Sequence, residues 1–214
     1  MEKSNTLKES LGNFLRNAFD LMVINWMFIL CCIPVITIGP ALCAMMFVML
    51  KLSRGEPVSA ARDFLRSFQE NFKSGLILGL LAMVLLAIAC GDCYFALQQA
   101  DSGRSLFLVV GILMGALFLL VLSYGFALQA MFENPVKIQL LNTVKLAFVA
   151  PGKTVMLWLI WLAPVLLALA LPFEAVAHLG FLYVLMGFSL PAFGAGRILR
   201  DVFDKVNGSP VIPE

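Results

Sequence analysis

The chain has 214 residues, of which 61% are hydrophobic and only 13% are charged, and its mean hydropathy is +0.95. A soluble globular protein carries about 25% charged residues, so this chain holds too few polar side chains to cover a soluble core. The composition therefore excludes an ordinary soluble domain and predicts an integral membrane protein, whereas the net charge of +2 excludes nothing by itself.

The first predicted element is an amphipathic helix that runs into a membrane span at about 19–33. No cleavable signal peptide is expected before it, because residues 1–20 alternate polar and apolar side chains. Apolar residues at spacings of three, four and seven predict the helix. They are Leu7, Leu11, Phe14, Leu15, Ala18 and Met22.

Residues 21–52 are apolar throughout and are too long for one span of roughly 20 residues. Pro34 ends or kinks a helix near Ile33, whereas Gly39 and Pro40 suit the start of a new one. The segment 34–40 therefore predicts a tight reversal between short spans at about 19–33 and 40–52. A pair of full spans and a re-entrant hairpin both fit this pattern.

Residues 58–73 predict an amphipathic helix in the cytoplasmic interface or under the bundle. Arg62, Asp63, Arg66, Gln69, Glu70 and Lys73 fill its polar face. Its apolar stripe consists of Ala61, Phe64, Leu65, Phe68 and Phe72. A surface helix that supports the fold and a helix that docks a partner both remain open.

Two long apolar runs follow, at about 75–97 and 105–132, and each predicts a span. Asp92 is an acid within the first run, where a carboxylate is costly and marks a candidate functional site, or simply lies among headgroups. Ser123, Tyr124 and Gln129 in the second run are candidates for an interior polar path, although small polar groups also bond between helices as packing.

A second amphipathic helix is predicted at about 136–149. Its apolar stripe consists of Leu140, Leu141, Val144, Ala147 and Phe148, and Lys137, Gln139, Asn142 and Lys145 oppose it. Both amphipathic segments begin just after a proline, Pro57 and Pro135, and both lie between two spans. The pattern indicates a possible repeat of span, amphipathic helix and span, with chance patterning as the alternative.

The last two spans are predicted at about 154–171 and 176–196. Glu174 and His178 are four residues apart, so in a helix they would share one face. They would form either an ordinary polar contact or a metal or proton site. The cysteines Cys31, Cys32, Cys43, Cys90 and Cys93 lie in or near spans, where cysteine behaves as a small apolar residue. Neither a metal site nor a catalytic residue is expected.

The distribution of positive charge predicts the orientation. If both termini are cytoplasmic, 14 of the 15 lysines and arginines fall on the cytoplasmic side and only Arg104 falls outside. The sequence therefore predicts an all-α polytopic bundle of about six spans in a single domain, with two interfacial helices, in a cytoplasmic or inner membrane.

A family resemblance rests on residues 34–73. The motifs that carry it are P-x-x-T-x-G-P-A at the turn, K-L-x-R-G after it, and D-F-x-x-S-F-x-x-N-F-K in the amphipathic helix. In these motifs the chain resembles the YesL-like family of bacterial polytopic membrane proteins, which has no settled activity. The resemblance marks Thr37 as a turn residue and Asn71 as a residue of the interfacial helix, and it implies an accessory role in carbohydrate uptake.

Three functions are weighed from the sequence. The first is a non-enzymatic membrane component accessory to solute uptake, with the lipid bilayer and a carbohydrate ABC transporter or another membrane protein as partners. The second is a small solute channel or carrier with Asp92 and Gln129 on a polar path. The third, a membrane enzyme, lacks a convergent catalytic set. No cofactor and no nucleic-acid partner are expected.

Overall fold

The computed structural model describes residues 2–98, 103–132, 134–172 and 180–206. All regular structure among these residues is helical, which confirms the predicted all-α class. The elements are α1 (Glu2–Cys31), the 3₁₀-helix η1 (Val35–Thr37), α2 (Ile38–Ser53), α3 (Ala60–Glu70), α4 (Phe72–Gln98), α5 (Gly103–Leu120), the π-helix η2 (Val121–Gly125), α6 (Phe126–Met131), α7 (Val136–Val149), α8 (Pro151–Ala170), the π-helix η3 (Tyr183–Gly187) and α10 (Ser189–Val206).

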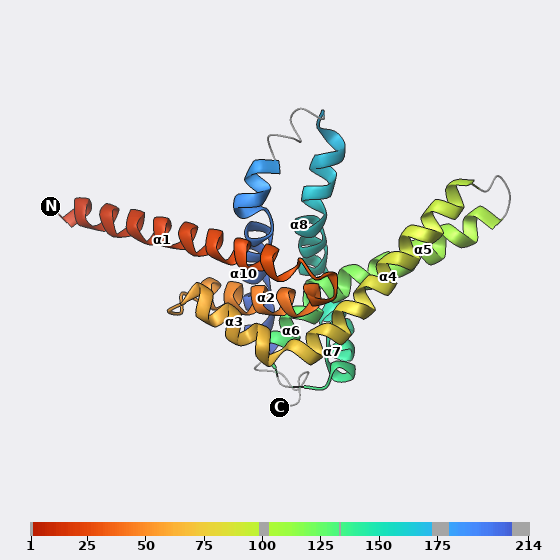
Figure 1. Ribbon diagram of the computed structural model, residues 1–214, viewed down its shortest axis with the longest axis horizontal. Helices are drawn as coiled ribbons and strands as arrows, with labels where there is room; N and C mark the ends of the chain where they lie inside the picture. Colours follow the sequence, from red (N-terminus) through yellow and green to blue (C-terminus); the bar gives the residue numbers. More distant parts are fainter. Residues whose placement is uncertain (1, 99–102, 133, 173–179, 207–214) are drawn as a thin grey trace.

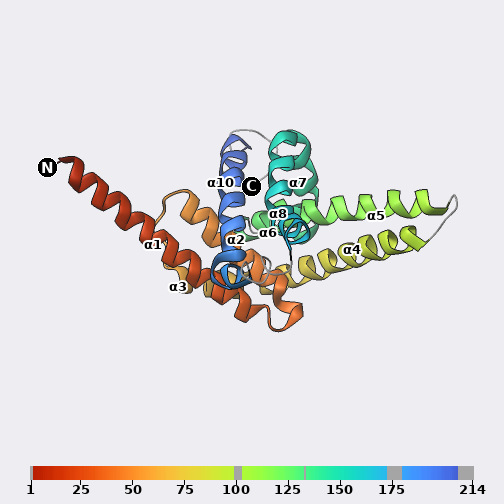
Figure 2. The same cartoon turned by 90° about the horizontal axis from the view of Figure 1, so that it is seen from above.

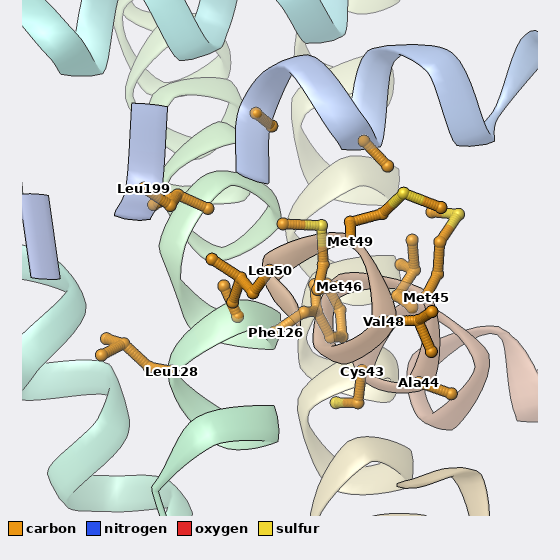
Figure 3. Close-up of a cluster of buried hydrophobic side chains, with 14 of the residues drawn as sticks. Cys43, Ala44, Met45, Met46, Val48, Met49, Leu50, Phe126, Leu128 and Leu199 are labelled. Atoms are coloured by element: carbon orange, nitrogen blue, oxygen red, sulfur yellow. The ribbon is translucent and has the colours of Figure 1, made fainter. Parts of the chain in front are cut away.

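Helix α2 lies at the centre of the molecule, and α1, α3, α4, α6 and α10 pack against it (Figures 1 and 2). Its sequence is apolar on every side, which is typical of a helix enclosed by other protein elements. The side chains of residues 41–46 and 48–50 are all buried. Figure 3 shows Met45, Met46 and Met49 of α2 in one cluster with Phe126 of α6 and Leu199 of α10.

Three arms extend from this centre in different directions: α1, the α4–α5 hairpin, and α8 (Figure 1). The hairpin and α8 carry large exposed apolar side chains, such as Val84, Ile112 and Leu159. Faces of this kind require a surrounding other than water. Four segments of the described residues are long and apolar enough to cross a membrane, namely Val35–Ser53, Phe72–Gln98, Arg104–Met131 and Pro151–Ala170.

The last predicted span, 176–196, begins outside the described residues, and from residue 180 it is broken rather than straight. The helices Gly180–Gly187 and Ser189–Lys205 are bent by 46° at Phe188, and together they form a fifth candidate span. Pro191 gives the physical reason, because it has no N–H to donate to the Gly187 carbonyl and its ring clashes with that group. The first predicted span, 19–33, lies at the end of the continuous helix α1, which ends at Cys31 and is not among the described segments long and apolar enough to cross a membrane.

The amphipathic helix predicted over 58–73 is shorter in the structure, where α3 ends at Glu70 and α4 begins at Phe72. Phe64 is completely buried and Phe68 is half-buried, whereas Phe72 is 40% exposed. Ala61 and Leu65 of the predicted stripe are exposed, whereas Ala60 and Ser67 are buried. Of the predicted stripe, Phe64 and Phe68 are therefore the residues that meet protein.

Helix α7 lies over the predicted residues 136–149, but its buried face does not coincide with the predicted apolar stripe. Gln139 and Asn142, which the pattern places on the polar face, are buried together with Thr143. Leu141 and Phe148 of the stripe are 55% and 83% exposed, whereas the stripe residues Leu140 and Ala147 pack against the core. Gln139 faces inward because its amide satisfies carbonyls at the end of α6.

Candidate functional site

The reversal between α1 and α2 is held by the hydroxyl of Thr37. Its Oγ1 lies 2.5 Å from the Cys31 carbonyl and 2.6 Å from the Pro34 carbonyl, to which it donates. These carbonyls belong to the end of α1 and the start of the turn, where the helix leaves acceptors without partners. Pro34 has extended backbone dihedrals and Pro40 lies in the first turn of α2, which the structure begins at Ile38.

Gly39 lies at the closest helix crossing in the first half of the chain. A Cβ at Gly39 would collide with the carbonyl oxygen of Gly75 and would lie 2.8 Å from the Cα of Gly79. Gly75 and Gly79 are four residues apart on α4, the small-residue spacing that lets helix backbones meet in membranes. Among the described residues only Gly55 has positive φ, so close approach rather than backbone conformation requires glycine at position 39.

Asn25 of α1 satisfies the backbone of the broken last helix. Its Nδ2 donates to the carbonyls of Tyr183 (3.3 Å) and Val184 (2.9 Å), and its Oδ1 accepts from the N–H groups of Phe188 (2.9 Å) and Ser189 (3.1 Å). Asn25 is completely buried. Backbone groups freed within a membrane span need partners from the protein, and one amide supplies both donors and acceptors. We call Asn25 and residues 183–189 the helix-break site.

A cavity of about 350 Å³ lies beside the helix-break site. We call it the lateral cavity, because it lies between α4, η2 and α6 on one side and α8 with the broken helix on the other. Almost every lining residue is apolar. Its walls include Phe28, Leu42, Met83, Trp161, Tyr183 and Phe188. Two of these rings pack edge to face, since the centroids of Tyr183 and Phe188 are 5.3 Å apart and their planes make an angle of 89°.

A second polar region lies where the inner face of α7 packs against η2 and α6. Gln139 Nε2 donates to the carbonyls of Leu128 (3.1 Å) and Phe132 (2.8 Å), which close the end of α6. The hydroxyls of Tyr124 and Thr154 are 2.9 Å apart and link η2 to the first turn of α8. Four buried polar atoms in this region find no hydrogen-bond partner among the described residues, namely Ser123 Oγ, Gln129 Oε1, Gln139 Oε1 and Asn142 Nδ2.

Asp92 and Gln129 are not brought together. A Cβ at Gly111 of α5 would lie 3.2 Å from the Cβ of Asp92, which places Asp92 opposite Gly111 in the hairpin. Gln129 is 18 residues further along the same helical run (129 − 111), so the two polar groups are about 27 Å apart along its axis. The Asp92 Oδ2 atom is buried without a hydrogen-bond partner between α4 and α5.

The remaining predicted polar residues do not form a chemical site in the described part of the chain. Glu174 and His178 lie outside the described residues. Cys90 and Cys93 are free thiols exposed on α4. Asn71 lies between α3 and α4, and its Nδ2 donates to the Ser67 carbonyl of α3 at 3.1 Å. Within the described ranges, no three histidine, cysteine or acidic side chains are grouped as metal ligands.

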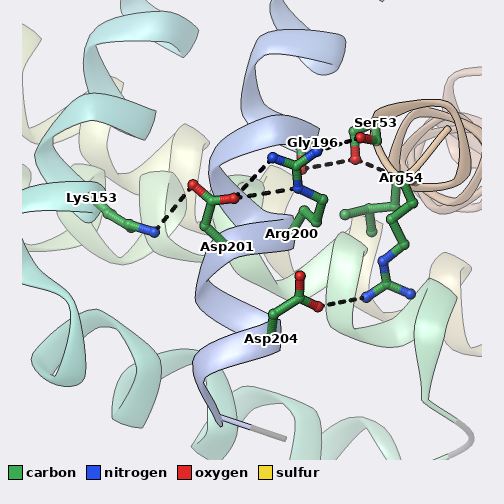
Figure 4. A network of polar contacts seen from close by, with 8 residues as sticks. Ser53, Arg54, Lys153, Gly196, Arg200, Asp201 and Asp204 are labelled. Carbon is green, nitrogen blue, oxygen red and sulfur yellow. Dashed lines mark hydrogen bonds and ion pairs between the residues drawn. The ribbon is translucent and has the colours of Figure 1, made fainter.

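Charged side chains gather around the ends of α2 and α10 and the start of α8 (Figure 4). Arg200 donates to the Ser53 carbonyl at 2.6 Å, which satisfies the end of α2, and it also pairs with Asp201 at 3.1 Å. Lys153 of α8 lies 3.6 Å from Asp201, and Arg54 lies 3.6 Å from Asp204. This cluster ties three segments together at one end of the bundle.

These features define the class: an all-helical protein with four or five apolar segments long enough to cross a membrane, packed around one enclosed central helix. Residues 21–93, from the end of α1 through most of α4, match a family described as protein of unknown function, DUF624. The match includes the reversal, the glycine crossing, α3 and Asn25. No curated protein and no solved structure matches the chain.

Proposed function

We propose that this chain is a non-enzymatic multi-pass protein of a bacterial cytoplasmic membrane that assists solute uptake by contacting a carbohydrate transporter or another membrane protein. The enclosed central helix carries the part of this proposal that sets the chain apart from a channel, and the uptake role rests on the family resemblance. Because α2 fills the middle of the molecule and Asp92 is far from Gln129, the described interior offers no continuous polar path. The exposed apolar faces of the α4–α5 hairpin are available for helix contacts.

The orientation proposed has both termini in the cytoplasm. The charge cluster around Arg54, Lys153 and Arg200 supports it, because these basic residues gather at one end of the bundle, whereas Arg104 is the second residue of α5, which begins at the far tip of the hairpin. Cysteine variants at Ser4 and Ser209 test this orientation in a cysteine-free background. A membrane-impermeant maleimide added to intact cells should label neither, and strong labelling of either one contradicts the orientation.

A partner of the hairpin can be trapped in living cells. A photocrosslinking amino acid at Leu113, which is exposed on α5, should yield an adduct with a membrane subunit of a transporter, whereas the same probe at buried Leu128 should not. Deletion of the gene should also lower the uptake of one labelled carbohydrate without changing the amount of its transporter. Unchanged uptake across a panel of sugars, with adducts to lipid alone, would overturn the proposal.

A second candidate function is a small channel or carrier, and the unpartnered polar atoms near η2 favour it. Ser123, Gln129 and Gln139 present oxygens inside the protein that nothing in the described chain satisfies. Purified protein in sealed vesicles would then carry a labelled sugar, and Gln129→Leu would reduce the flux several-fold. Flux equal to that of empty vesicles would exclude this function.

A further inference from the structure

The lateral cavity lies near the middle of α4 and α8, two helices that are long and apolar enough to cross a membrane. Its α4 lining runs from Gly79 to Leu86, in the middle of a helix that spans Phe72–Gln98. Its α8 lining runs from Trp161 to Val165, again away from both ends of Pro151–Ala170. Residues near the middle of a span lie at the depth of the hydrocarbon rather than the headgroups.

The lining offers water few partners. Among the lining residues only Trp161, whose Nε1 is buried without a hydrogen-bond partner in the described chain, and Tyr183 carry polar side-chain atoms. A buried water needs two to four polar partners, so an apolar occupant fits the rest of the cavity better. Leu86 and Val165 at the rim are 41% and 55% exposed on the outside of the bundle, so the cavity opens sideways where α4 and α8 diverge. An apolar space that opens at midplane depth is accessible to the tails of lipids.

The helix-break site forms part of the back wall of the cavity. Phe28 packs on Phe188 with ring centroids 5.2 Å apart, and the N–H of Phe188 donates to Asn25 Oδ1. Gly79 on the opposite wall lies against Gly39 at the helix crossing. The helix break and the glycine crossing therefore both shape the cavity, although they belong to opposite ends of the chain.

From this placement we propose that the lateral cavity binds one acyl chain of a membrane phospholipid, which enters sideways between α4 and α8 and contacts Trp161 and Phe188. The helix break forms the wall against which the chain lies. A bound chain would seal the contact between the α4–α5 hairpin and the broken last helix. This proposal does not depend on any role in solute uptake.

The test uses the full-length protein in a mild detergent and a phospholipid that carries a photoactivatable diazirine near the end of one acyl chain. Labelling should saturate, should be competed by the same unlabelled phospholipid, and should map to peptides that contain residues 161–165 and 183–188. Met83→Trp places an indole in the cavity and should lower the labelling about tenfold. Val84→Trp, which points outward on the same helix, should leave it unchanged.

Three results would overturn the proposal: labelling that does not saturate, labelling spread evenly over exposed apolar positions such as Ile112, and equal labelling in both tryptophan variants. If Met83→Trp does not fold, Leu86→Trp at the rim serves in its place. Native mass spectrometry of the unmodified protein gives an independent measurement. It should show one phospholipid that survives detergent removal, and a bare protein mass alone would count against the site.

Discussion

Helices α3 and α7 each follow one candidate membrane segment and precede another, yet they bury different side chains. Each begins shortly after a proline. α3 buries the ring of Phe64 and exposes most of its charges, whereas α7 buries the amides of Gln139 and Asn142 beside Leu146 and exposes Leu141 and Phe148. The difference shows that a short helix takes its inner face from what its neighbours need, and not from its own apolar stripe alone.

The neighbours differ in one respect that explains this contrast. Next to α3 lies the enclosed helix α2, against which Phe64 packs as an apolar side chain, while Lys51 of α2 pairs with Asp63 of α3. Next to α7 lies the end of α6, where the carbonyls of Leu128 and Phe132 lack helical partners and accept from Gln139 instead. An unpaired carbonyl is costly inside a membrane, so α7 packs with Gln139 facing the end of α6.

The largest effect is expected at Phe64 of α3. Phe64→Ala removes a completely buried ring and should lower the free energy of unfolding by about 3–5 kcal/mol. Leu65→Ala, one residue further along on the exposed face, is the matched control and should change stability by less than about 0.5 kcal/mol. Thermal unfolding in detergent measures both, and equal melting temperatures would show that α3 does not pack by this face.

Alanine substitutions at the glycines that follow α3 and α7 should change the free energy of unfolding in opposite directions. A Cβ at Gly75, at the start of α4, would lie 2.8 Å from the Cα of Pro40, whereas a Cβ at Gly152, at the start of α8, meets nothing within 4 Å. Gly75→Ala should therefore destabilise the protein by about 1–3 kcal/mol through overpacking. Gly152→Ala should stabilise it by about 0.4–1 kcal/mol, because it restricts the unfolded chain.

The same unfolding measurement separates these two variants. Destabilisation by both substitutions would mean that α8 is crossed as closely as α4. If Gly75→Ala left the free energy of unfolding unchanged, the contact among Gly39, Gly75 and Gly79 would not be what holds α2 against α4.

The sequence predicted the class and the helices better than it predicted their inner faces. Composition alone indicated a helical membrane protein, and the prolines and glycines at 34–40 indicated where the chain reverses. The inward face of α7 could not be predicted, because periodicity locates a stripe without saying whether lipid or protein covers it. Asn25 was missed because its partners are about 160 residues away, although an amide within an apolar run was an available signal.

The break at Phe188 also had a local signal, since Gly187 and Pro191 lie within five residues in an otherwise apolar segment. The sequence prediction nevertheless gave a single span at 176–196, because that segment is apolar over a length that can cross a membrane. The loss of the Gly187 carbonyl's partner becomes decisive only when a side chain elsewhere in the fold, here Asn25, can satisfy the groups that the break frees.

An effect of intermediate size is expected at Gln139 of α7. Gln139→Leu keeps the volume but removes the two hydrogen bonds to the end of α6, and it should lower the free energy of unfolding by about 1–3 kcal/mol. Lys137→Leu on the exposed side of the same helix is the control and should have little effect. If Gln139→Leu were stabilising, hydrophobic burial would outweigh the need to pair the carbonyls, and our explanation of the inward-facing Gln139 would fail.

The smallest effect should depend on pH and should appear in α3 alone, because α7 contains no acidic residue. Asp63 is partly buried, which by itself raises its pKa, but hydrogen bonds from Lys51 and the Ser59 N–H together with the charges of Lys51 and Arg66 lower the pKa below 3.8 overall. A lowered pKa in the folded state stabilises the protein above the unfolded value, and this stabilisation is lost as the pH falls through 3.8 and below. The Lys51–Asp63 ion pair, at 2.9 Å, should contribute at most about 1 kcal/mol, since both side chains are partly exposed. Asp63→Asn should therefore melt slightly below the unmodified protein at pH 7, and the difference should vanish toward pH 3. A difference that persists at pH 3 would mean that Asp63 acts through packing rather than through its charge.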